Sequence, residues 1–205
     1  MKYRALTIAR EYGSGGAEIA GSVASSLGWR LVDKVLLTEI SSRAKVPVAD
    51  VVVLDEQVDP WLHRLTRPLW GTGGDGISAI IPVDLFDADA EAALAKQIIQ
   101  EAYWQGNCVI VGRGAQCVLQ AKPDVFHALV YARRADRVHR LLARVAPGTD
   151  VCELLHTIDE QRHDYVHRHY GENRLDPHLY DLAINCHNQV QAAARLILLA
   201  MESAG

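Results

Sequence analysis

Several features that mark whole classes of protein are missing from this sequence. No apolar run approaches the roughly 18 residues of a membrane-spanning helix, and the four cysteines form no Cys-x-x-Cys pair. The net charge of −4 shows no excess of the basic residues that general nucleic-acid binders need. We therefore expect no membrane segment, no nucleic-acid partner, and neither a zinc cluster nor a disulfide framework.

We also expect no secretion signal in the N-terminal segment, because the apolar run in MKYRALTIA is too short. We expect a cytoplasmic protein whose cysteines are buried, reduced thiols. The chain has 205 residues, of which 49% are hydrophobic, which is enough for one domain with a sizeable core. The sequence leaves homo-oligomerisation open.

Short apolar segments alternate with segments of helical periodicity along most of the chain. The expected strands cover residues 6–9, 29–33, 108–111, 125–132 and 180–185. The expected helices cover residues 17–27, 34–45, 88–105, 134–146 and 189–202, and a further helix follows a capping box of Asp150 and Glu153. This alternation predicts an α/β fold in three layers, a parallel sheet with helices on both faces.

A glycine-rich turn joins the first expected strand to the first expected helix. It contains Gly13, Ser14, Gly15 and Gly16 within the segment AREYGSGGAEIA. A strand, a glycine turn and a helix start together aim backbone N–H groups at one point, and the helix dipole adds positive charge there. The turn indicates a binding site for a phosphate, with a plain tight turn as the alternative.

The usual phosphate loop, G-x-x-x-x-G-K-[ST], is incomplete in this turn. When the pattern is aligned on Gly15, Arg10 stands at the position of its first glycine and Gly16 stands at the position of its lysine. The usual pattern has a serine or threonine after the lysine, whose hydroxyl reaches magnesium. Ala17 stands at that position here, and Glu18 stands at the position of the threonine in the variant pattern GKGT. The side chains that act on phosphate and metal are therefore absent, and we hypothesise that Arg10 supplies part of the missing positive charge.

Two more polar clusters follow expected central strands, at the carboxyl ends where parallel sheets bind their ligands. They are residues 112–114 and residues 132–134. Arg113 comes directly after an apolar strand and lies between two glycines. We interpret it as a functional arginine, with a structural ion pair as the alternative.

Six segments carry a resemblance to a known family: TIAREYGSGGAEIA, LGWRLVDKVLL, GNCVIVGRGAQCVL, VFHALVYARRADRVHRL, IDEQRHDYVHRHYG and DPHLYDLAIN. Over nearly its whole length the chain resembles the cytidylate kinase-like family, a branch of the P-loop nucleoside monophosphate kinases. The resemblance implies a single P-loop kinase-like domain over residues 1–205, with an acceptor-binding insert at about 46–87 and a lid at about 157–178. It also implies phosphoryl transfer from ATP, with Mg2+, to CMP or dCMP.

The resemblance assigns roles to residues on both sides of the reaction. Residues 13–16 match the phosphate loop without its lysine, and Asp33 matches an acidic residue near the acceptor nucleotide. Arg113 matches an arginine that contacts the acceptor phosphate. The family pattern has an arginine at the position of Glu39 and an aspartate at the position of Gly114, so the acceptor site departs from that pattern.

Further roles fall on the expected lid and its entrance. Arg137 matches an arginine of the helix after the 125–132 strand, and Asp159 with Arg162 matches the D-x-x-R motif whose arginine approaches the phosphates. The loop lacks the serine or threonine hydroxyl that normally binds the Mg2+ of ATP. Ser14, or carboxylates acting through water, would have to take its place. We interpret the histidines of the lid as polar surface and expect no protein metal site.

Three functions remain open at this point. The first is a kinase acting on a (deoxy)cytidine monophosphate-like acceptor, whose ligands are nucleotides or phosphorylated small molecules. The second is a catalytically weak nucleotide- or anion-binding regulatory module, which the missing lysine favours. The third is a small-molecule kinase with a non-nucleotide acceptor, which Glu39 and the unusual segment at 66–87 favour.

Overall fold

The computed structural model describes residues 2–33, 42–43, 88–187 and 189–204. Most of the expected helix at 34–45 and all of the expected insert at 46–87 lie outside the described residues. Glu39 lies outside them as well.

The described strands form one five-stranded parallel sheet in the order β2-β3-β1-β4-β5. These strands are β1 (Ala5–Arg10), β2 (Arg30–Val32), β3 (Cys108–Val111), β4 (Val125–Tyr131) and β5 (Leu182–Asn185). The helices of the described residues include α1 (Gly16–Leu27), α5 (Ala88–Gln105), α6 (Ala115–Val118), α7 (Arg134–Leu142), α8 (Val151–Tyr170) and α9 (Val190–Ser203). A short 3-10 helix, η3, covers Pro177–Leu179.

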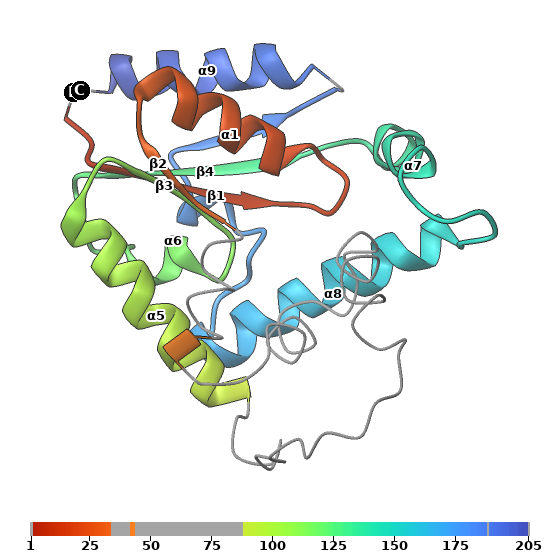
Figure 1. The fold of residues 1–205 in the computed structure, drawn as a ribbon, viewed down its shortest axis with the longest axis horizontal. Coiled ribbons are helices and arrows are strands. Elements are labelled where there is room, and N and C mark those ends of the chain that lie inside the picture. Colours follow the sequence, from red (N-terminus) through yellow and green to blue (C-terminus); the bar gives the residue numbers. More distant parts are fainter. Residues whose placement is uncertain (1, 34–41, 44–87, 188, 205) are drawn as a thin grey trace, which may run out of the picture.

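The helices lie on both faces of the sheet, which confirms the expected three-layer α/β fold. Figure 1 shows α1 and α9 above the sheet and α5 with α6 below it. Helix α7 lies beyond the carboxyl ends of the central strands, and α8 runs back from it beneath the sheet (Figure 1). The carboxyl ends of β1 and β3 therefore face a region bordered by α8.

Some boundaries differ from the sequence-based expectations. Helix α7 ends at Leu142 instead of residue 146, and residues 143–145 form a turn. Strand β5 begins at Leu182 instead of residue 180, because the segment before it forms η3. Asp150 was correctly expected to cap α8, since its carboxylate accepts bonds from the backbone N–H groups of Cys152 and Glu153.

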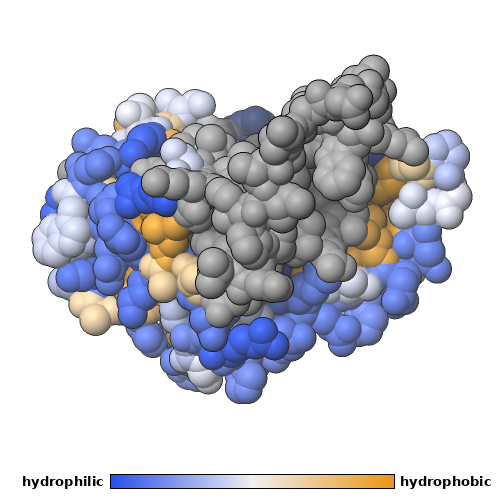
Figure 2. Space-filling view, turned by 60° about the horizontal axis from the view of Figure 1, so that its bottom comes forward, coloured by the Kyte–Doolittle hydropathy of each residue, from blue (hydrophilic) through white to orange (hydrophobic). Residues whose placement is uncertain are grey.

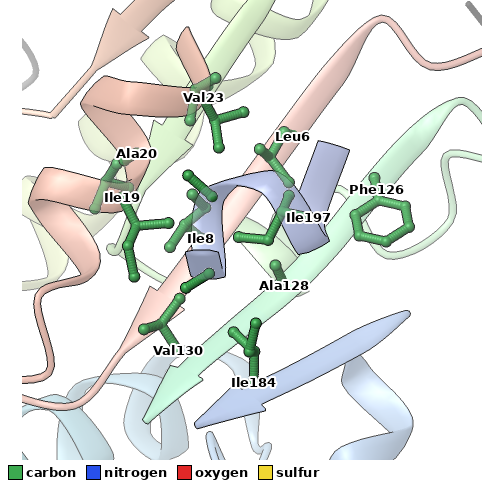
Figure 3. Packing of buried hydrophobic residues seen from close by; sticks show 14 of the residues in the cluster. Leu6, Ile8, Ile19, Ala20, Val23, Phe126, Ala128, Val130, Ile184 and Ile197 are labelled. Carbon is green, nitrogen blue, oxygen red and sulfur yellow. The ribbon is translucent and has the colours of Figure 1, made fainter. Parts of the chain in front are cut away.

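The larger core lies between the sheet and the helices α1 and α9. Leu6 and Ile8 point to this face of β1, whereas Ala5 and Thr7 point to the other face, as the period of two along a strand requires. Figure 3 shows the side chains of this core coming from β1, β4, β5, α1 and α9. It labels Leu6, Ile8, Ile19, Ala20, Val23, Phe126, Ala128, Val130, Ile184 and Ile197.

The exposed apolar side chains of the described residues are spread over several elements. No helix among them is long and apolar enough to cross a membrane. Figure 2 shows a face whose coloured surface is mainly hydrophilic, with apolar residues in separate areas. Large exposed apolar side chains occur on different elements, for example Trp104 on α5 and Leu199 on α9.

A buried polar pair joins β1 to β4 on the face opposite the larger core. Thr7 Oγ1 and His127 Nδ1 lie 2.7 Å apart in a hydrogen bond. Burial lowers the pKa of His127 below its usual value, and the charge of Asp181 opposes this shift only in part. The folded protein therefore favours the neutral imidazole.

We predict that His127 makes the protein less stable in acid. Because its folded pKa lies below its unfolded pKa, the unfolded chain binds the proton first. The stability is fully present above about pH 6.5, the unfolded value, and is lost as the pH falls through the folded pKa. Urea unfolding of wild type and His127→Gln, at about pH 8 and about pH 5.5, should show a smaller acid-induced loss in the variant. An equal loss in both proteins would contradict this role.

Candidate functional site

The glycine loop connects β1 to α1 and ends in an uncapped helix start. Gly13 and Gly15 have φ of 75° and 87°, in the left-handed region that glycine adopts without a steric penalty. Gly15 is the N-cap of α1, and no side chain of the described residues caps this helix by a hydrogen bond. The N–H groups of its first turn have no partner within the helix, so the loop has the geometry of an anion cradle.

Helix α7 packs directly against this loop. A Cβ atom at Gly13 would lie 3.0 Å from Leu141 Cδ1, and one at Gly15 would overlap the guanidinium of Arg140. Arg140 and Arg144 both form ion pairs with Glu18, in the first turn of α1. The outer side of the loop is therefore covered by basic side chains from α7 and from the turn that follows it.

A pocket of about 40 Å3 lies beside the loop, at the carboxyl ends of β1 and β3. Since a water needs roughly 10–15 Å3 of such a cavity, this volume fits a small group. Four arginines and no acidic residue of the described chain are among the residues that line it. The four are Arg10, Arg113, Arg162 and Arg174. The lining favours a multiply charged anion such as a phosphate.

Arg113 lies in a strained turn. Its φ of 58° is left-handed, and both neighbours, Gly112 and Gly114, have positive φ as well. A non-glycine residue in this region is destabilised, and such strain gathers at functional sites. The ring of Tyr170 packs where a side chain at Gly114 would lie. Burial raises the pKa of Tyr170 to about 12, so its hydroxyl stays protonated and donates to the carbonyl of Arg113.

The side chain of Arg113 is itself part of a buried ion pair. Its Nη1 donates to Glu91 Oε1 at 2.5 Å, and the two side chains are 5% and 1% exposed. Both interpretations of Arg113 thus have support, because it lines the pocket and also neutralises a buried carboxylate. The guanidinium also lies over the ring of Tyr165, 5.6 Å from its centroid.

A second buried cluster surrounds Asp159. Its carboxylate accepts from the backbone N–H of Tyr12 at 3.0 Å, from Arg137 Nη2 at 2.5 Å and from Arg174 Nη2 at 3.0 Å. Arg137 also pairs with Glu11 at 3.0 Å. Asp159 and Arg137 are absent from the lining of the pocket and lie behind it, where they join the glycine loop to α7 and α8.

Arg174 connects this cluster to the pocket. It is 5% exposed, and burial lowers the pKa of its guanidinium while the charge of Asp159 opposes the shift. Arg174 Nη1 and Arg162 Nη1 each donate to the carbonyl of Arg10 at 3.2 Å. The carbonyl of the last residue of β1 therefore accepts hydrogen bonds both from α8 and from the segment that follows α8.

The structure thus brings together part of the predicted site. Arg10, Arg113 and Arg162 line one pocket, and Asp33 lies 3.8 Å from Arg10 Nη2. Residues 13–16 form the adjacent loop, in which Ser14 is completely buried. The hydroxyl of Ser14 has no hydrogen-bond partner among the described residues.

Sequence reasoning missed Arg174 and Glu91. Arg174 has no local signal, because its partner Asp159 is separated from it by a helix end. Glu91 does have a local signal. It precedes Ala95 by four residues and Ile98 by seven, which places it on the apolar face of α5. A carboxylate on such a face requires a buried partner.

The fold and the loop define the chain as a P-loop kinase-like protein. The family model of the cytidylate kinase-like family matches residues 5–188, and the chain belongs to that family.

Solved structures of similar fold include an uncharacterized protein from Eubacterium ventriosum ATCC 27560. Its TM-score is 0.63 at 19% identity, over 97% of this chain and 98% of that chain. A shikimate kinase from Bacteroides thetaiotaomicron has a TM-score of 0.57 at 13% identity, over 97% of this chain and 98% of that chain. At these identities the likeness concerns the fold. No curated protein sequence matches the chain.

We predict that Arg113 and Glu91 depend on each other for stability. Arg113→Ala removes a charged partner from a buried carboxylate, which costs about 3–5 kcal/mol of unfolding free energy. The double variant Arg113→Met, Glu91→Leu removes both charges and should be clearly more stable than the single variant. Urea denaturation of the three proteins measures this. A double variant as unstable as Arg113→Ala would show that the pair is not the cause.

Proposed function

We propose that the protein transfers a phosphoryl group from ATP, with Mg2+, to a (deoxy)cytidine monophosphate-like acceptor. The observation that carries this proposal is the arginine-lined pocket beside an uncapped glycine loop. A donor phosphate on the loop and an acceptor phosphate in the pocket would lie next to each other. Family membership supports the same reaction.

The residues fit the demands of phosphoryl transfer, which are alignment and charge compensation. The N–H groups of residues 13–16 would bind the donor phosphates, and Arg113 would orient the acceptor phosphate with its planar fork. Arg162, on α8, would approach the transferring group. We propose that residues 157–178 act as the lid and that residues 46–87, outside the described part, bind the acceptor base.

ATP fits this site better than a protein-bound metal does. The cradle and the arginines suit polyphosphate, whereas Ser14 is buried and Glu18 is paired with Arg140 and Arg144. Mg2+ keeps several waters and often relies on substrate phosphates for its ligands. Bound through ATP, it would neutralise charge on the donor phosphates. Asp33, which lies next to Arg10, would act on it through water.

Two alternatives have specific support. The contacts of Arg140 and Leu141 with the loop favour a regulatory module that binds a nucleotide or anion with little turnover. The similarity in fold to a shikimate kinase favours a non-nucleotide acceptor.

We predict turnover that depends on Arg162. ADP formation from ATP and Mg2+ should be measured over a panel of nucleoside monophosphates, with CMP and dCMP included. Arg162→Ala should lose roughly 100-fold or more in kcat, the size of effect seen when one transition-state donor is removed. Its Nη1 donates to the carbonyl of Arg10, which also accepts from Arg174. Because that carbonyl keeps a donor in the variant, we expect the variant to fold.

Arg168→Ala is the matched control, because Arg168 lies on the same helix and is exposed. It should keep wild-type turnover. ATP binding without turnover of any acceptor would instead identify the regulatory module. Turnover of shikimate or another non-nucleotide acceptor alone would identify the third function.

A further inference from the structure

Arg10 occupies the space that the missing lysine would fill. A Cβ atom at Gly16 would lie 2.7 Å from Arg10 Cβ, 3.0 Å from Arg10 Cδ and 3.4 Å from Arg10 Cγ. The hydrocarbon part of Arg10 therefore passes directly over position 16. Any side chain at position 16, a lysine included, would collide with it.

The backbone of Gly16 does not itself require glycine. Gly16 is the first residue of α1, and its φ is not in the left-handed region, unlike that of Gly15. Arg10 Cβ is fixed to the end of β1 and cannot rotate away. The closest obstacle to a side chain at position 16 is therefore the side chain of Arg10.

The guanidinium of Arg10 extends from the loop toward the arginine-lined pocket. A Cβ atom at Gly112 would lie 2.7 Å from Arg10 Nη1, and Arg10 Nη2 lies 3.8 Å from Asp33 Oδ1. Arg10 thus borders both the glycine loop and the pocket that contains Arg113 and Arg162. Among the described residues, Arg10 is the cation that reaches from the glycine loop, the proposed donor site, to the pocket, the proposed acceptor site.

We propose that Arg10 and Gly16 exchange the two roles of the usual loop, with the phosphate-contacting cation at position 10 and the glycine at position 16. In the pattern G-x-x-x-x-G-K, the glycine stands at position 10 and the lysine at position 16. The ligand of Arg10 is a phosphoryl group of the bound nucleotide, a role that rests on the proposed function. Asp33 is a positioning residue for its guanidinium.

A stability cycle tests the steric half of this proposal without any ligand. Gly16→Ala should lower the urea midpoint in the wild type and also in Arg10→Ala, because alanine keeps the obstructing Cβ. In Arg10→Gly the same change should leave the midpoint equal or higher, since alanine is the better helix former. Arg10→Ala is the matched control. An equal effect of Gly16→Ala in all three backgrounds would overturn the pairing.

A second experiment tests the role in phosphate binding. Binding of ATP with Mg2+ is measured by calorimetry, and ADP formation is measured separately. Arg10→Gly should weaken ATP binding at least about tenfold, as loss of a charge-assisted hydrogen bond implies. Arg10→Gly with Gly16→Lys restores the usual pattern and should recover affinity, whereas Gly16→Lys alone should not raise it above that of the wild type.

The two measurements separate failure of this proposal from failure of the proposed function. Unchanged ATP affinity in Arg10→Gly, with wild-type turnover intact, overturns the role of Arg10 alone. ATP binding that depends on Arg10, without turnover of any acceptor by the wild type, supports the exchange and contradicts the kinase function. A wild-type protein that binds no ATP overturns both, leaving only the steric pairing.

Discussion

The carboxylate of Asp159 is the point on which the arrangement of the site depends. It lies between two arginines that are 8% and 5% exposed, Arg137 and Arg174, and it bonds to both. Without it, two buried positive charges would face each other close to the glycine loop. Removing one partner of a buried charged group is costly because the other charge remains unpaired. The cluster therefore fixes α7, α8 and the segment after α8 relative to one another.

The same carboxylate ties the loop to α8. Tyr12 donates its backbone N–H to Asp159, and the carbonyl of Arg10 accepts from Arg162 and Arg174. Two of the arginines that line the pocket are thus bonded to the last residue of β1, which leads into the loop. A shift of α8 would change the pocket and the entry to the loop together. In a phosphotransferase, such a connection would link closure over one phosphate to the geometry around the other.

Local patterns in the sequence predicted much of the fold and less of the site. The apolar strands, the glycine turn and the Asp150 cap depend on neighbouring residues, so periodicity and cap chemistry were sufficient to find them. The order of the strands and the contact between Tyr12 and Asp159, 147 residues apart, depend on tertiary packing that no local pattern records. Arg174 was missed for this reason. The glycine at position 16, where the usual loop has lysine, was visible in the sequence, but the crowding of that position by the Arg10 side chain required the structure.

The overlap between Arg10 and position 16 also has a historical consequence. A lineage that passes from the usual loop to this one, or back, must change both positions. A chain with lysine at 16 that first gains arginine at 10 suffers a collision, and a chain that first loses its lysine lacks the cation. Under the proposed exchange of roles, selection would act against either intermediate and would disfavour single steps between the two loop types. Descendants of each type should therefore inherit positions 10 and 16 as a unit.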